Sequence, residues 1–181
     1  LVSAGVLGIL AFFLIDRRRG VSRLFPSGPF DPRTKVGSGM LMVGLLALST
    51  CSFGFYGPLL LAALHGYSPV TTGLIIASES VSWSLMSILV ATAPVRHEPA
   101  IVRGGALMIL GGIVGFAWAV PQGSIAALLV FALLQGGGFG LCWPSIAVRC
   151  VRFADDAERA LASAAPSTIQ RIGYAVGTAA A

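Results

Sequence analysis

Charged side chains are scarce in this sequence, and their scarcity excludes most classes of soluble protein. Only 10% of the 181 residues are charged and 56% are hydrophobic, whereas a typical soluble domain carries about 25% charged residues. Residues 36–95 contain one carboxylate, Glu79, and one histidine, His65, and residues 104–148 contain no charge. A soluble globular enzyme or a disordered chain needs far more polar surface. We therefore expect an all-α integral membrane protein.

Cysteines are also few, and they exclude a disulfide framework. Cys51, Cys142 and Cys150 are widely separated and form no CxxC or Cys/His spacing, so we expect neither a disulfide scaffold nor a metal site. The sequence also lacks an HExxH motif, an acidic cluster and a nucleophile–base pair. We accordingly expect no enzymatic activity and no cofactor.

The excess of positive charge does not indicate a nucleic-acid partner. The net charge is +5, but the basic residues flank long apolar runs instead of forming a polar binding face. The lipid bilayer is the expected partner of such a chain.

Neither end of the sequence has the features of a complete membrane protein. Position 1 is Leu, and the apolar run over residues 1–15 is shorter than the ~20 residues that a spanning helix needs. Basic residues follow this run instead of preceding it, unlike in a signal peptide. We expect an internal piece of a longer protein, with residues 1–15 as the end of a truncated helix.

Two long uncharged runs predict four complete spans. The first run is broken at His65-Gly66-Tyr67-Ser68-Pro69 and the second at Pro121-Gln122-Gly123-Ser124, both rich in turn formers. With the two truncated ends, we expect a polytopic bundle of six helical segments, four of them complete. The segments of the bundle at residues 36–181 are expected near 37–64, 71–93, 102–120, 124–148 and 167–181.

The basic residues indicate the orientation of these spans. All 12 Lys and Arg residues fall in or beside the connections 16–35, 94–103 and 149–166, and none falls in the two other connections. The positive-inside rule places these three connections in the cytoplasm. Residues 16–35 read as a cytoplasmic linker, and charge spacing from Arg152 to Arg159 favours a short surface helix, with Pro166 opening the last span.

Glu79 is the carboxylate that stands within a predicted span. A charged side chain at the centre of a membrane helix costs roughly 2.5–3.5 kcal/mol, and such residues often mark ion or substrate pathways. Glu79 is therefore our candidate for proton coupling. The alternative is a protonated carboxyl that only bonds to a neighbouring helix.

Other side chains are candidates for a substrate path. Ser82, Trp83 and Met86 follow Glu79 at spacings that share one helix face, and an indole ring attracts organic cations. Gln135 is a further candidate, although an interhelical hydrogen bond is equally compatible with its position. For Trp83, ordinary packing or anchoring at the membrane interface is the alternative that we favour over a substrate contact.

Glycine pairs four residues apart predict close helix packing. This spacing lets helix backbones approach one another, and the pairs are Gly111 with Gly115, Gly136 with Gly140, and Gly173 with Gly177. The run GGGFG at 136–140 is no phosphate loop, because no Lys-Ser/Thr follows it and it lies inside an uncharged span.

Several of these motifs together resemble one family. The sequences YGPLLL at 56–61, HGYSP at 65–69 and TGL at 72–74, with GGGFGLCWP at 136–144, ERA at 158–160 and APSTIQRIG at 165–173, resemble the major facilitator superfamily. The resemblance is to the C-terminal half of the 14-helix drug/proton antiporter branch. The Gly-Asp-Arg loop common in the superfamily is not found at 94–103.

This resemblance implies a function and a set of partners. A secondary active transporter, with proton-coupled efflux of small organic compounds across a bacterial inner membrane, is the leading hypothesis. Its partners would be a small-molecule substrate, protons and the N-terminal half of the same chain. A non-transporting membrane scaffold or subunit of packed helices, and a membrane-embedded enzyme, are the alternatives.

Overall fold

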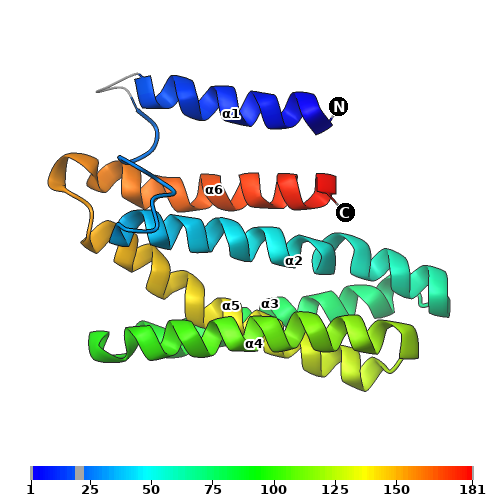
Figure 1. Cartoon of the computed structure of the whole chain (residues 1–181). Coiled ribbons are helices and arrows are strands. Elements are labelled where there is room, and N and C mark those ends of the chain that lie inside the picture. Colours follow the sequence, from blue (N-terminus) through cyan, green and yellow to red (C-terminus); the bar gives the residue numbers. More distant parts are fainter. Residues whose placement is uncertain (1, 19–22, 181) are drawn as a thin grey trace. The chain divides into compact units, whose positions relative to one another are not determined.

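The structure is a computed structural model that describes residues 2–18 and 23–180 (Figure 1). Residues 1, 19–22 and 181 lie outside the described residues, so part of the predicted linker and the extreme ends of the predicted segments are not assessed. The described chain forms six α-helices and no strand: α1 Val2–Arg18, α2 Lys35–His65, α3 Pro69–Ala91, α4 Glu98–Ala119, α5 Ile125–Arg152 and α6 Arg159–Ala180.

Four of the described helices are long and apolar enough to cross a membrane. They are α2, α3, α4 with its flanking turns (Val95–Gln122), and α5. The apolar runs form helices because a backbone in lipid must satisfy its own hydrogen bonds. The predicted all-α polytopic membrane class is confirmed.

Two helix starts differ from the sequence prediction. Pro99 fits the first turn of α4, because the N–H that proline lacks would have no intrahelical acceptor there. Helix α4 therefore begins at Glu98. Helix α6 begins at Arg159 instead of near 167, which leaves Pro166 inside the helix. The intervening sequence ALASAA is rich in alanine, the strongest helix former, and it extends the helix toward its N-terminus.

The short surface helix expected around residues 152–159 does not form as a separate element. Helix α5 instead continues to Arg152, and only a three-residue turn, η4 (Asp156–Glu158), precedes α6. One of the expected charge pairs is present, since Arg159 Nη2 lies 2.6 Å from Asp156 Oδ1.

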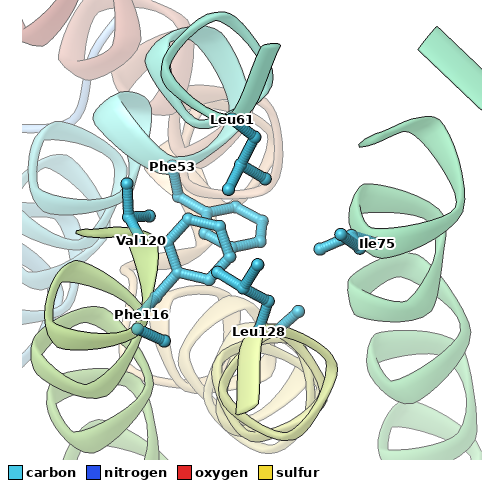
Figure 2. Close-up of a cluster of buried hydrophobic side chains, with 8 residues drawn as sticks. Phe53, Leu61, Ile75, Phe116, Val120 and Leu128 are labelled. Atoms are coloured by element: carbon cyan, nitrogen blue, oxygen red, sulfur yellow. The ribbon is translucent and has the colours of Figure 1, made fainter. Parts of the chain in front are cut away.

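The chain divides into two compact units, each described here by itself. Residues 52–146 form one unit, which we call the central unit, and residues 1–51 with 147–181 form the other, which we call the terminal unit. Figure 2 shows the hydrophobic core of the central unit. Phe53 and Phe116 meet edge to face at 4.4 Å between ring centroids. The other labelled members of this core are Leu61 of α2, Ile75 of α3, Val120 just after α4, and Leu128 of α5.

Hydrogen bonds join the connection between α2 and α3 to the connection between α4 and α5. His65 Nε2 donates to the Val120 carbonyl at 2.6 Å, and the Tyr67 hydroxyl donates to the Gly123 carbonyl. Gly123 has a φ of +65°, and a Cβ at this position would collide with the His65 ring. Glycine is therefore required at 123 both by backbone conformation and by space.

In the terminal unit, α2 and α6 run in the same direction and approach closely. A Cβ at Gly173 would lie 2.8 Å from the Gly44 carbonyl, and one at Gly177 would lie 2.9 Å from the Leu48 carbonyl. The two helices are parallel, because the residue numbers at the two contacts increase together along α2 and α6. The close contact of the two backbones is made by the glycines four residues apart on α6, Gly173 and Gly177.

Candidate functional site

Glu79 lies on α3 beside Gln135 of α5. The Gln135 Nε2 donates to Glu79 Oε1 at 3.4 Å. The Gln135 side chain is completely buried, at 0% exposure, whereas Glu79 is half-buried. Among the described residues, Gln135 Oε1 has no hydrogen-bond partner. A carboxyl group and a half-satisfied amide thus face each other between two apolar helices.

Glycines on α5 make this approach possible. A Cβ at Gly136 would overlap the Glu79 carbonyl, and a Cβ at Gly140 would overlap the Trp83 carbonyl. The two helices run in the same direction, since 79 meets 136 and 83 meets 140. This backbone contact fixes the level at which Glu79 meets Gln135.

Two serines on α3 strengthen the same helix pair. Ser82 Oγ donates to the Leu133 carbonyl at 2.7 Å, and Ser87 Oγ donates to the Gly140 carbonyl at 3.3 Å. Such interhelical bonds in membranes contribute about 0.6 kcal/mol on average. The hydroxyl of Ser82 therefore serves the contact between α3 and α5.

The remaining substrate-path candidates also touch α5. The Trp83 ring lies 5.3 Å from the Phe139 ring, centroid to centroid, tilted by 34°. Met86 packs against the glycine run, since a Cβ at Gly140 would lie 2.8 Å from its Cβ. The structure thus brings Glu79, Ser82, Trp83, Met86 and Gln135 together along one helix pair.

The glycine run contacts α4 on its other side. A Cβ at Gly138 would lie 2.8 Å from the Ile109 nitrogen, and one at Gly112 would lie 2.7 Å from the Gln135 nitrogen. Helix α5 is therefore packed between α3 and α4. The described residues place Gln135 at the point where the three helices meet.

The glycines of α4 that make these contacts differ from the pair singled out in the sequence. Gly111 and Gly115 face the side chains of Leu134 and Phe131, while Gly105 and Gly112 face the α5 backbone. Gly105 and Gly112 are seven residues apart, two helical turns on one face. The sequence signal for this contact is therefore a seven-residue glycine spacing, which differs from the four-residue spacing of Gly111 and Gly115.

A second polar cluster lies in the terminal unit and was not expected from the sequence. Arg23 Nη2 lies 2.7 Å from Glu158 Oε1, and the Ser27 hydroxyl and backbone N–H donate to Glu158 at 2.5 and 3.0 Å. Partial burial disfavours the charged form of Glu158, but the bonds from Ser27 and the Arg23 guanidinium outweigh it and hold its pKa below the usual value. Glu158 thus attaches the linker to the start of α6.

Asp16 anchors the same linker from its other end. Its carboxylate oxygens accept from the backbone N–H groups of Leu24 at 2.7 Å and Phe25 at 3.2 Å. The Phe25 ring packs against Phe13 at 5.2 Å between centroids. The described start of the linker is therefore held by α1 through Asp16 and by the turn η4 through Glu158.

Metal ligation finds no support in the described residues, which contain no group of three or more His, Cys, Asp or Glu side chains that could hold an ion. An open groove of about 470 Å³ runs along α2. It is lined by two serines and five apolar residues: Ser38, Leu41, Met42, Leu45, Leu46, Leu48 and Ser49. No charged group lines this groove.

Known proteins provide a comparison for the whole chain. The family profile of the Major Facilitator Superfamily matches residues 1–178. A probable multidrug-efflux transporter of Mycobacterium tuberculosis is 31% identical over 190 aligned residues, which cover 98% of this chain. The puromycin resistance protein pur8 of Streptomyces alboniger is 30% identical over 187 aligned residues, which cover 99% of this chain.

These relatives are longer proteins. The alignments span 38% of the M. tuberculosis protein and 36% of the S. alboniger protein. No solved structure matches the chain significantly. The match over nearly the whole sequence agrees with the resemblance seen in its motifs, and the chain belongs to the Major Facilitator Superfamily.

Proposed function

We propose that the protein is a secondary active transporter that exports small organic compounds in exchange for protons. The observation that carries the proposal is the carboxyl group of Glu79, which lies in an apolar span and contacts a buried amide on the neighbouring helix. Keeping a titratable group there costs stability, and a function in moving protons explains its presence. The names of the relatives, a multidrug-efflux transporter and a puromycin resistance protein, support efflux.

The exchange would depend on competition at Glu79. When the site faces outward, the carboxylate takes a proton from water, and when it faces inward it releases the proton as a cationic substrate approaches. Trp83, whose ring packs at a tilt against Phe139, presents an aromatic surface that attracts cations. Met86 adds a flexible apolar side chain that adapts to different substrate shapes.

Alternating access needs two halves that rock about a central site. We propose that these helices work with an N-terminal half of the same polypeptide, in line with the greater length of the relatives. We assign no enzymatic role to the chain.

The orientation follows from the basic residues. We propose that the connections 16–35, 94–103 and 149–166 face the cytoplasm of a bacterium and that the helices cross its inner membrane, as the positive-inside rule requires. Two contacts support parts of this arrangement. The linker meets residue 158 through Arg23, and the connections near 66 and 122 meet each other through Tyr67.

Proton-driven transport by a variant without the carboxyl tests the function. In proteoliposomes that contain the complete polypeptide, Glu79→Gln should abolish proton-driven uptake of ethidium and puromycin, because the amide keeps the size but cannot titrate. Glu79→Asp should retain part of the activity. Asp156→Asn, in an exposed turn, is the matched control and should transport as the wild type does. Wild-type transport by Glu79→Gln would refute the proposal.

A further inference from the structure

The unsatisfied oxygen of Gln135 needs an explanation. This atom is buried and without a partner in the described structure, while the nitrogen of the same amide donates to Glu79. A buried acceptor without a donor costs about 1–3 kcal/mol. A membrane helix could avoid this cost with leucine or methionine at 135. The amide is therefore a feature that the apolar packing does not require.

The ionisation state of Glu79 decides whether that oxygen can be paired. An ionised carboxylate has only acceptors, whereas a protonated carboxyl carries one O–H donor and one carbonyl acceptor. An amide offers the complementary pair, an N–H donor and a carbonyl acceptor. Only the protonated form of Glu79 can bond to both ends of the Gln135 amide at once.

We propose that Gln135 is a positioning residue that links the protonation state of Glu79 to the contact between α3 and α5. When a proton from water adds to the carboxylate, the new O–H donates to Gln135 Oε1 while the amide N–H continues to donate to the other oxygen. When that O–H bond breaks and the proton returns to water, Oε1 loses its donor. This inference rests on the proposed function, since it gives the transport proton a structural effect.

The packing around Gln135 restricts other solutions. Its backbone lies against Gly112 of α4, where a Cβ would be 2.7 Å away, and the next residue, Gly136, lies against the Glu79 backbone. The helix positions on both sides are thus fixed by backbone contacts. The acid–amide pair changes its bonding at a point where three helices meet, so the proton alters the strength of that contact.

Among the described residues of α3, α4 and α5, the other charged and titratable groups are bonded elsewhere or lie near helix ends. On α3, Glu79 is the single charged residue. The Cys142 thiol of α5 donates to the Val102 carbonyl. The charged residues of α4 and α5 lie in the first two turns of α4 and the last turn of α5: Glu98, Arg103, Arg149 and Arg152. From α2, His65 is engaged with Val120 at the end of the unit.

Infrared spectroscopy of the complete, reconstituted polypeptide tests the pair directly. A spectrum at low pH minus one at high pH contains the carbonyl band of protonated Glu79, which is identified by its loss in Glu79→Gln. Gln135→Met keeps a similar shape but removes both amide groups. It should move this band to higher frequency, because a carbonyl that loses a hydrogen bond has a stiffer C=O bond. Gln122→Met, at an exposed amide that donates to Trp118, should leave the band unchanged.

Exchanging the two groups between the helices provides a rescue. Glu79→Gln combined with Gln135→Glu restores an acid–amide pair, and it should return a carbonyl band at the wild-type frequency together with pH-dependent transport. A Glu79 band at the wild-type frequency in Gln135→Met, or a free-acid frequency in the exchanged variant, would overturn the inference. Transport that persists in Glu79→Gln would instead refute the proposed function, and the band would still decide whether the pair forms.

Discussion

At the residue scale, the site depends on two positions of α5 that have no side chain as much as on the polar side chain of Gln135. Gly136 and Gly140 leave the space into which the backbone of α3 fits. Glycine lowers helix stability by about 1 kcal/mol relative to alanine. The close packing of two helices offsets that cost and brings Glu79 to Gln135.

Replacing a glycine by alanine tests whether the glycine is required for helix packing or could be any small residue. Gly136→Ala should lower the stability by about 1–3 kcal/mol, because its Cβ would overlap the Glu79 carbonyl. The matched control is Gly73→Ala on α3, where a Cβ meets nothing within 4 Å. This control should be neutral or slightly stabilising.

Thermal unfolding of the purified protein in detergent measures both changes. A melting temperature for Gly136→Ala equal to that of Gly73→Ala would show that the two helices do not pack as described.

The position of Glu79 was more predictable than its partner. A lone carboxyl in an uncharged run is visible in the sequence. Its contact with Gln135 joins residues 56 positions apart, and helical periodicity specifies which residues share a face but not the level at which two helices meet. The four-residue spacing identifies Gly136 and Gly140 as packing residues, but it does not specify their partners on α3.

At the element scale, the apolar runs and their breakers predicted the helices α2 to α5 because lipid leaves the backbone few alternatives. Helix α6 begins at Arg159, earlier in the chain than the predicted start near 167. Proline favours the first turn of a helix, but the alanine-rich residues 160–165 have a high helix propensity and form the first turns of α6 instead. The attachment of the linker through Glu158 escaped prediction because it joins segments 131–135 residues apart.

That attachment makes the linker depend on a single carboxylate. Glu158→Ala should speed the amide hydrogen exchange of residues 24–28, because Ser27 N–H and Arg23 lose their acceptor. Asp156→Ala, which removes an exposed carboxylate paired with Arg159, is the control and should leave this exchange unchanged. Equal exchange in the two variants would contradict the attachment.

The attachment also has a defined pH dependence. The pKa of Glu158 is lowered in the folded protein, so its stabilising contribution is complete above the unfolded value of about 4.3 and is lost as the pH falls through the folded value. The difference in melting temperature between the wild type and Glu158→Ala should therefore persist at neutral pH and shrink below about pH 4. A difference that grows on acidification would have the wrong sign for this account.

At the scale of the whole molecule, the orientation of the chain can be tested by labelling. In intact cells, a cysteine at Gln122 should react with a membrane-impermeant thiol reagent, and one at Asp155 should react only after the cells are opened. Both positions are exposed, whereas Cys51, Cys142 and Cys150 are buried and give little background. Labelling of the Asp155 position in intact cells would reverse the proposed topology.

The central claim is that a proton and a substrate compete at Glu79, and proton release measures that competition most directly. The complete polypeptide is purified in weakly buffered detergent near neutral pH, and ethidium is added while a pH-sensitive dye reports free protons. The account predicts that the wild type releases protons as ethidium binds and that Glu79→Gln releases none, with Asp156→Asn behaving like the wild type. Proton release from Glu79→Gln equal to that from the wild type would contradict the account.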